Sequence, residues 1–358
     1  MKVRAARVLA LALVPLALSG ACRKKPAEVN DITASVTFNR PRAPLGSAIE
    51  VTYTWTTGPG FKPLKQDYRA LSHFLDSHKV PLFTDDHVPV PPPSSWEANK
   101  TYTYQRTVFI PVYPYVGPAQ VVMGLYPAAG GGERVAMKGE DVGLRAYKVA
   151  SLELLPQTEN IFPVYKEGWH SPESSPSNPS QERTWTKKEA VVSFKNPKKD
   201  VILYLEADTN YKAFSEPPVL TIAVNDKTGL VVPIENSEVF LKKVRFKAAD
   251  LGSEDWFHLK LAMSQSFVPK NLNPPLNNDD RELGLLVYHL YVGEADKVGE
   301  LPAREVVDAA ALPPPSTRPG TKTPATVKGA PPATKPASST QPGPGAKVTA
   351  TPKPTPKA

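Results

Sequence analysis

Apolar and polar residues alternate through the middle of the chain, and this alternation predicts short β-strands. In the segment SAIEVTYTWTT, residues 47–57, the apolar side chains of Ile49, Val51 and Tyr53 recur at every second position. That is the period of a strand with one buried face. β-Branched and aromatic residues dominate further segments of this kind, namely 34–38, 100–113, 119–127, 190–194, 201–208, 219–225, 238–246, 256–264 and 283–292. Residues 67–77, DYRALSHFLDS, fit neither a helix nor a strand well, and their structure stays open.

Turn-forming Pro, Gly, Asn and Asp residues separate these segments at the spacing of antiparallel β-sandwiches. We therefore expect an all-β protein with two antiparallel sandwich domains, residues 31–150 and residues 160–296. The first resembles immunoglobulin-like domains in its phrase LGSAIEVTY, in which a turn glycine leads into an alternating strand. It also resembles uncharacterised bacterial lipoprotein domains in the phrases DDH and VFIPVYPY, a resemblance that implies no activity.

Three phrases in the second domain carry another resemblance. They are GWHSPE at 168–173, RTWTKKEAVVSF at 183–194 and DDRELGLLVYHLYV at 279–292. With them the domain resembles the jelly-roll, galactose-binding-like modules of bacterial envelope and glycan-handling proteins. The resemblance implies a jelly-roll-like sandwich.

The first twenty-one residues have the layout of a secretory signal peptide. Three basic residues are followed by an apolar run at 8–18 and by the small residues Ser19, Gly20 and Ala21. The apolar run is shorter than the roughly 20 residues that span a bilayer. We therefore expect an exported chain from which residues 1–21 have been removed.

Cys22 is the only cysteine of the chain and directly follows the small residues. The segment resembles the lipobox of bacterial lipoproteins, which implies that Cys22 is acylated and becomes the mature N-terminus. Ser19 stands where that pattern usually has Leu, so ordinary secretion with cleavage at the same bond is the alternative. Two or three acyl chains, at about 0.8 kcal/mol per buried CH₂, would anchor the protein stably. Residues 22–30 would then link the anchor to the first domain. With Arg23 rather than Asp after the cysteine, the resemblance to enterobacterial lipoproteins implies sorting to the outer membrane, and a periplasmic membrane face is the alternative.

The net charge of +8 lies at the two ends of the chain. The signal peptide carries three positive charges and residues 312–358 carry seven, which leaves −2 on residues 22–311. A folded nucleic-acid-binding face is therefore not expected. The 13 prolines and scarce bulky apolar residues of 312–358 predict disorder, and we place the start of the disordered tail at residue 297. The tail is suited to contact with anionic envelope polymers, or it has no specific partner.

Aromatic residues outside the predicted strands are the candidates for ligand binding, because sugar rings present flat apolar faces to aromatic side chains. The candidates are Trp169, His170, Trp96, Tyr113 and Tyr115. Packing in the core is the alternative for each of them. The other tryptophans lie in or beside predicted strands and are expected in the core: Trp55, Trp185 and Trp256.

The segment HFLDSHKVPLFTDDH, residues 73–87, gathers histidine and aspartate side chains that bind divalent metals in other proteins. Its spacing matches no metal motif, and a polar hairpin with a turn near Ser77–Val80 is the favoured alternative. The chain has no nucleophile elbow, and AAGGGE at 128–133 lacks the Lys-Ser/Thr of a phosphate-binding loop. We therefore expect no catalysis, no cofactor and no metal.

These observations together predict a lipid-anchored, non-enzymatic envelope protein that binds envelope polysaccharide or cell wall. The alternative is a scaffold lipoprotein that docks a protein partner in envelope assembly or export. Sugar binding requires exposed aromatic rings in a concave site, whereas docking requires a contiguous apolar patch.

Overall fold

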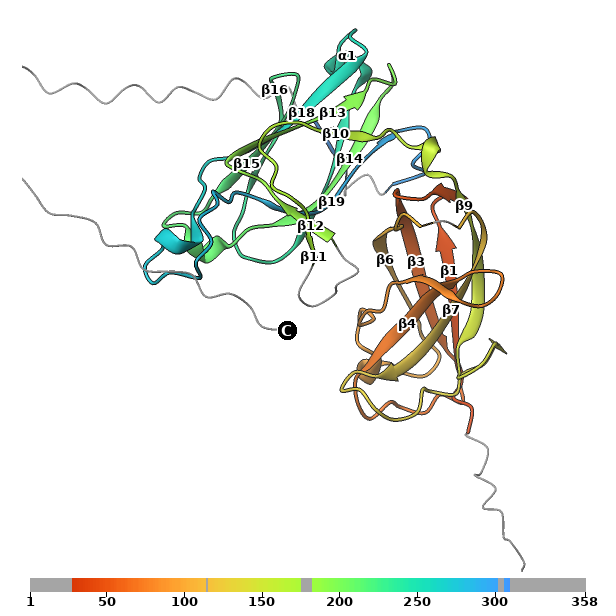
Figure 1. Cartoon of the computed structure of the whole chain (residues 1–358). Helices are drawn as coiled ribbons and strands as arrows, with labels where there is room; N and C mark the ends of the chain where they lie inside the picture. The colour runs from red at the N-terminus through yellow and green to blue at the C-terminus, as the bar shows by residue number, and fades with distance from the viewer. Residues whose placement is uncertain (1–27, 114, 175–181, 302–305, 310–358) are drawn as a thin grey trace, which may run out of the picture. The chain divides into compact units, whose positions relative to one another are not determined.

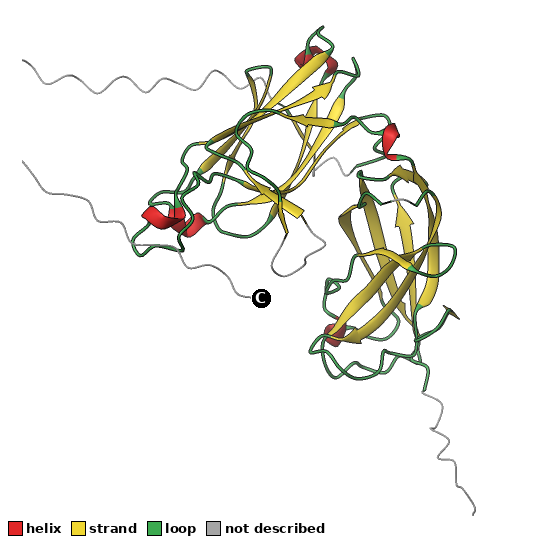
Figure 2. Ribbon diagram, in the orientation of Figure 1, coloured by secondary structure: helices red, strands yellow, loops and turns green. Residues whose placement is uncertain are grey.

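The computed structural model describes residues 28–113, 115–174, 182–301 and 306–309 of the 358 residues (Figure 1). Strands make up most of the regular structure, beside one short α-helix, α1 (Ala248–Leu251) (Figure 2). Single 3₁₀ turns lie at Pro93–Ser95, Gln157–Glu159, Tyr211–Ala213 and Pro269–Asn271. The predicted all-β sandwich class is confirmed. The predicted signal peptide, Cys22 and the tail from residue 310 lie outside the described residues.

The first sandwich packs a three-stranded sheet, in the order β1-β3-β6, with a sheet in the order β2-β9-β7-β4-β5, and β8 pairs with β9. Its strands are β1 (Ile32–Phe38), β2 (Arg42–Pro44), β3 (Ala48–Thr57), β4 (Tyr68–Leu75), β5 (Pro81–Thr84), β6 (Thr101–Phe109), β7 (Gly117–Pro127), β8 (Glu140–Asp141) and β9 (Tyr147–Leu155). Alternate residues of β3 enter the core, and the rings of Tyr53 and Trp55 are fully buried there. The expected core position of Trp55 is therefore confirmed.

The second sandwich packs a five-stranded sheet, β10-β13-β18-β15-β16, with a six-stranded sheet, β11-β12-β19-β14-β17-β20. Its strands are β10 (Pro163–Tyr165), β11 (Glu173–Ser174), β12 (Glu182–Trp185), β13 (Glu189–Lys195), β14 (Val201–Asp208), β15 (Val219–Val224), β16 (Lys227–Pro233), β17 (Phe240–Phe246), β18 (Trp256–Met263), β19 (Leu286–Glu294) and β20 (Val306–Asp308). Alternating side chains of β13, β14 and β18 form the core, among them Phe194, Leu203 and Phe257.

The structure differs from the sequence prediction in two places. Residues 67–77, left open above, contain the strand β4, which pairs with β7 along its whole length. The disordered tail does not begin at residue 297, because Val298 is buried and Val306–Asp308 form the strand β20. β20 pairs in parallel with Lys243–Arg245 of β17, so the chain still belongs to the sheet at residue 308.

Candidate functional site

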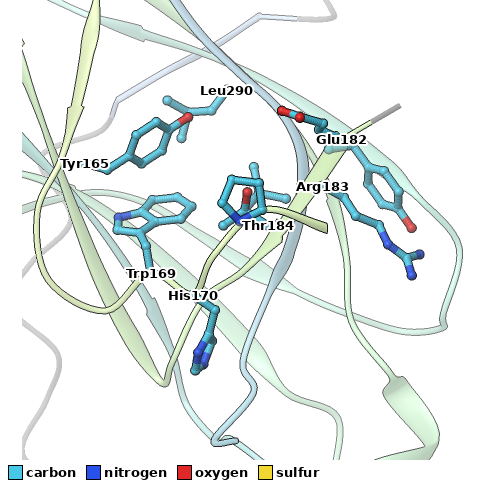
Figure 3. Close-up of a pocket in the computed structure, with 10 residues that line it drawn as sticks. Tyr165, Trp169, His170, Glu182, Arg183, Thr184 and Leu290 are labelled. Atoms are coloured by element: carbon cyan, nitrogen blue, oxygen red, sulfur yellow. The ribbon is translucent and has the colours of Figure 1, made fainter. Parts of the chain in front are cut away.

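A pocket of about 330 Å³ lies in the second sandwich between β10, the loop that follows it, and the strands β12 and β19 (Figure 3). This volume is at the lower end of the range for small-molecule sites, about 300–1,000 Å³. The lining residues are Tyr165, Trp169, His170, Pro172, Glu182, Arg183, Thr184, Val287, Tyr288 and Leu290. Two of the five predicted candidates, Trp169 and His170, therefore line one pocket.

Backbone hydrogen bonds hold the loop that carries Trp169 against two strands. Gly168 accepts a 2.8 Å hydrogen bond from the amide of Lys187, and Trp169 forms a bridge with Thr186. Gly168 has a φ of +83°, and a Cβ there would collide with the carbonyl oxygen of Glu189. Only glycine therefore fits the position that turns the chain into the pocket.

Tyr165 and Trp169 form an aromatic corner in the pocket. Their ring centroids are 4.8 Å apart, and the ring planes are nearly perpendicular at 76°. Tyr165 is 51% exposed, while the indole is half-buried and packs against the core. Leu290 of β19 adds apolar surface to the pocket (Figure 3), and Val287 of the same strand also lines it. The arrangement leaves aromatic surface open to a ligand.

Polar side chains line the rest of the pocket. The guanidinium of Arg183 forms a hydrogen bond with Tyr288, its Nη2 lies 3.9 Å from Glu173, and its Nε has no hydrogen-bond partner among the described residues. Tyr288 donates a 2.9 Å hydrogen bond to Asp208. Burial raises the pKa of Asp208 above 3.8, although that hydrogen bond and the charge of Arg183 oppose the shift. Arg183 is thus the cationic residue of the lining, and Figure 3 shows its guanidinium directed away from the aromatic corner.

His170 lies at the margin of the pocket, and Figure 3 shows its ring directed away from the aromatic corner. Its Nε2 is 2.7 Å from the carbonyl oxygen of Glu282, and its amide donates to the carbonyl of Trp185. These contacts anchor the loop, so the histidine positions its neighbour Trp169.

The other three candidates belong to the first sandwich and do not line this pocket. Trp96 is only 3% exposed, which corrects the expectation of an exposed ring. Its ring stacks on Tyr102 at 5.2 Å and meets Trp55 at 5.4 Å, so it closes one end of the core. Tyr113 packs partly against the same core, and its hydroxyl is buried without a partner among the described residues. Tyr115 donates a 2.7 Å hydrogen bond to the carbonyl of Pro118.

The histidine and aspartate residues of 73–87 lie on the β4–β5 hairpin and at its end, as the favoured alternative predicts. Asp85 accepts two 2.8 Å hydrogen bonds from Arg106 and one of 2.9 Å from Tyr53. The two ring nitrogens of His87 contact the carbonyl of Asp85 at 2.6 Å and the hydroxyl of Tyr104 at 2.7 Å. Within the described residues, no group of three or more histidine, cysteine or acidic side chains is placed to hold a metal.

Two of the tryptophans expected in the core lie outside it. Trp185 is half-buried against Phe267, and Trp256 is 45% exposed. The sequence did contain the signal: in WFHLKLAMS the residues Phe257, Leu259, Leu261 and Met263 occupy one face of the strand. Trp256 therefore shares the opposite face with the polar side chains of the strand.

Comparison with known proteins finds likeness in fold alone. No protein-family model matches the chain, and no curated protein is significantly similar to it. Similar solved structures include a family GH115 4-O-methyl-α-glucuronidase, BtGH115A, with 12% identity and a TM-score of 0.26. They also include the CBM22-1–CBM22-2 tandem domain of Xyn10C from Paenibacillus barcinonensis, with 8% identity and a TM-score of 0.24.

A third is the M60 catalytic domain with the CBM51-1 and CBM51-2 domains of Clostridium perfringens ZmpB, with 9% identity and a TM-score of 0.23. The three matches cover 41%, 70% and 76% of this chain, and 19%, 80% and 32% of the matched chains. At such identities and TM-scores the likeness carries no argument about what this chain binds.

No helix in the described part of the chain is both long and apolar enough to cross a membrane.

Proposed function

We propose that this protein binds carbohydrate in the pocket of Tyr165 and Trp169, and that it does so as a lipid-anchored protein of the bacterial cell envelope. The aromatic corner of Tyr165 and Trp169 carries the proposal. A sugar ring offers an apolar face that stacks on an aromatic side chain, and hydroxyls at its rim that pair with polar groups. The exposed ring of Tyr165 and the half-buried indole of Trp169 supply the apolar contact, and the lining residues Glu182 and Thr184 supply polar groups in the same small pocket.

The pocket is better suited to binding than to hydrolysis. Glycoside hydrolysis uses a pair of carboxyl groups that flank the scissile bond. Among the lining residues of the described chain, Glu182 alone carries a carboxylate. Asp208 does not line the pocket, and its carboxylate accepts a hydrogen bond from the hydroxyl of Tyr288. We therefore propose binding without catalysis.

The envelope address rests on the sequence. Cys22 follows a signal-peptide-like segment, and acylation of this cysteine would hold the protein at a membrane face. The net charge of −2 on residues 22–311 gives this part of the chain no general attraction to anionic polymers, so binding there depends on specific contacts. A pocket of defined shape provides such contacts.

The test is binding of the purified full chain, in detergent, to immobilised peptidoglycan, lipopolysaccharide and a glycan array. Trp169→Ala and Tyr165→Ala should each weaken the binding by about tenfold or more, which corresponds to about 1.4 kcal/mol. Tyr115→Ala, a partly exposed tyrosine of the first sandwich, is the matched control and should bind like the parent. Far-UV circular dichroism shows whether each variant is folded.

Loss of binding in the two pocket variants but not in the control would support the proposal. If the parent binds none of these polymers, carbohydrate binding is wrong. If the parent binds and Trp169→Ala binds equally well, the pocket is the wrong site.

A further inference from the structure

The outer face of the five-stranded sheet of the second sandwich carries a second set of exposed apolar side chains. The strand register places Val164 of β10, Ser193 of β13 and His258 of β18 side by side in one row. In the neighbouring row Lys195 of β13 is paired with Trp256 of β18. With strands about 4.8 Å apart, each row spans on the order of 10 Å across the sheet.

Three large apolar side chains are open to solvent on this face. Trp256 is 45% exposed, Val164 37%, and Phe162, which directly precedes β10, 44%. The opposite face of β13 and β18 is filled by buried Phe194 and Phe257. The indole of Trp256 therefore does not contribute to the core, and packing does not explain why a tryptophan stands at this position.

Two hollows adjoin on this face. One of about 560 Å³ is lined by Val164, Lys166, Ser193, Asn225, Leu251, Gly252, Glu254, Asp255, Trp256 and His258. The other, of about 350 Å³, is lined by Asn160, Ile161, Phe162, Val164, Lys195, Asn196, Pro197, Trp256 and Glu294. Val164 and Trp256 line both hollows, so the indole stands between two spaces that a single extended molecule can occupy together.

The hollows are also lined by polar groups that can form hydrogen bonds with a ligand. Ser193 Oγ lies 2.8 Å from Nδ1 of His258, which fixes the imidazole and leaves Nε2 with no hydrogen-bond partner among the described residues. The Nε1 donor of the exposed Trp256 likewise has no partner within the described part of the chain. Ser193 itself is only 1% exposed, so its hydroxyl is a support for the histidine and not an accessible nucleophile.

Charge on this face is balanced. Lys166 and Lys195 are offset by the carboxylates of Glu254 and Asp255. Glu294 is already paired with Lys199 at 2.8 Å. The surface therefore has no net preference for an anionic or a cationic ligand, which favours an uncharged one.

We infer that this face, centred on Trp256, is a second binding site that takes an extended, uncharged β-1,4-linked glycan. Such a chain is a flat ribbon whose apolar ring faces alternate with hydroxyl edges, and it matches a surface where exposed apolar and polar side chains alternate. The indole stacks on one sugar ring, while neighbouring sugars fill the hollow on each side and reach His258 Nε2. The site shares no lining residue with the pocket of Tyr165 and Trp169.

A glycan fits this face better than a docked protein does. Protein interfaces have an apolar centre depleted of charged residues. Here Lys195 lies in register with Trp256, and Ser193 and His258 lie in register with Val164, so polar groups interrupt the apolar area. The two hollows flank the ring, whereas a flat docking surface would not need them.

The test titrates the purified full chain with cellohexaose, chitohexaose, cellobiose and chitobiose, by calorimetry and by tryptophan fluorescence. At least one hexasaccharide should bind at least about tenfold more tightly than its disaccharide, because only the longer chain fills both hollows. Trp256→Ala should weaken the hexasaccharide about tenfold or more, and His258→Ala should weaken it severalfold. Lys260→Ala, on the same face of β18 but outside both hollows, is the matched control and should bind like the parent.

Trp169→Ala separates this inference from the proposed function. If Trp169→Ala keeps hexasaccharide binding and Trp256→Ala loses it, the second site is established whether or not the pocket binds sugar. Equal binding by Trp256→Ala and the parent, or no binding of either hexasaccharide, overturns the inference. Size-exclusion chromatography gives a further result that would overturn it. If the parent is an oligomer and Trp256→Ala is a monomer with unchanged glycan binding, the face is a protein interface.

Discussion

The indole nitrogen of Trp169 donates a hydrogen bond of 2.8 Å to the backbone carbonyl of Val191. The same carbonyl accepts a 3.0 Å hydrogen bond from the amide of Lys166. The beginning of the loop after β10 and its residue Trp169 are therefore both bonded to Val191 of β13. The bond fixes the orientation of the ring before any ligand arrives. A ligand in the pocket would therefore not have to immobilise this side chain, a cost that otherwise reduces affinity.

Trp169→Phe keeps an apolar ring but removes this hydrogen bond. We expect it to lower the free energy of unfolding by about 1 kcal/mol, the usual net contribution of one hydrogen bond, and to weaken carbohydrate binding less than Trp169→Ala does. Urea unfolding and the binding assay measure the two effects. A stability equal to that of the parent would show that the bond to Val191 contributes nothing.

Gly168→Ala tests whether the backbone of the loop positions the aromatic corner. The positive φ and the clash of a Cβ with the carbonyl of Glu189 should cost about 1–3 kcal/mol or displace the loop. Either result should reduce binding at the pocket, although no side chain that lines it has changed. Gly143→Ala is the control, since Gly143 also has a positive φ but has open space around its Cβ position. Normal binding by Gly168→Ala would contradict the role assigned to this glycine.

Trp96→Ala should act on the core of the first sandwich alone. Removal of a buried ring that contacts Trp55 and Tyr102 should lower the free energy of unfolding by about 3–5 kcal/mol. The folded fraction should still bind carbohydrate with the affinity of the parent. A specific loss of binding with unchanged stability would restore Trp96 as a ligand residue.

Asp85→Asn tests the buried network of the first sandwich. Burial alone would raise the pKa of Asp85, but hydrogen bonds from His87 and Arg106 outweigh it and hold the pKa below the ordinary value of 3.8. A depressed carboxyl pKa stabilises the fold above its unfolded pKa of about 3.9, and this contribution is lost as the pH falls from there towards the folded pKa. The amide leaves Arg106, whose side chain is 40% exposed, without its charged partner, at an expected cost of about 1.5 kcal/mol at pH 7.

The difference in stability between the parent and Asp85→Asn should therefore shrink when urea unfolding is repeated near pH 3. Asp76→Asn, at the turn of the same hairpin, is the comparison. The amide oxygen can still accept the hydrogen bonds from the backbone of His78 and Val80, so stability should change little at either pH. A gap that is equal at both pH values would mean that the charge of Asp85 is not what stabilises the network.

Cys22→Ala tests whether acylation of Cys22 anchors the protein to a membrane. The variant should move from the membrane fraction to the soluble periplasmic fraction when the full gene product is expressed in a Gram-negative host. The carbohydrate affinity should stay unchanged, because the change lies outside both sites. Retention in the membrane fraction would show that the lipoprotein interpretation is wrong.

The sequence was sufficient for the sandwich class because a two-residue period survives in strands such as β3 and β18, where one face is buried. The same alternation places Trp256 on the outer face of β18, although the size of its ring favours burial in the core. β9 was missed because Lys148, Ser151 and Glu153 give its exposed face too many polar residues. Local pattern thus identified strands better than it identified their faces.

The pocket itself could be predicted only in part. Trp169 was found because it lies in a loop rich in Pro and Ser, but Tyr165, Arg183 and Leu290 come from three different strands. Sequence order does not bring those strands together. The pairing of β12 with β19 brings Arg183 and Leu290 to one sheet, and the packing of the other sheet adds Tyr165 of β10. Trp96 was expected to be exposed because it lies in a loop, but a side chain in a loop can still pack against the core.

The short strand β20 has a consequence for solubility. It covers Lys243–Arg245 of β17, and β17 would otherwise be the last strand of its sheet with unpaired amide and carbonyl groups. Exposed strand edges of this kind recruit other chains and promote aggregation. Recombinant forms that end before residue 306 should therefore aggregate at concentrations at which forms that continue past residue 309 stay monodisperse.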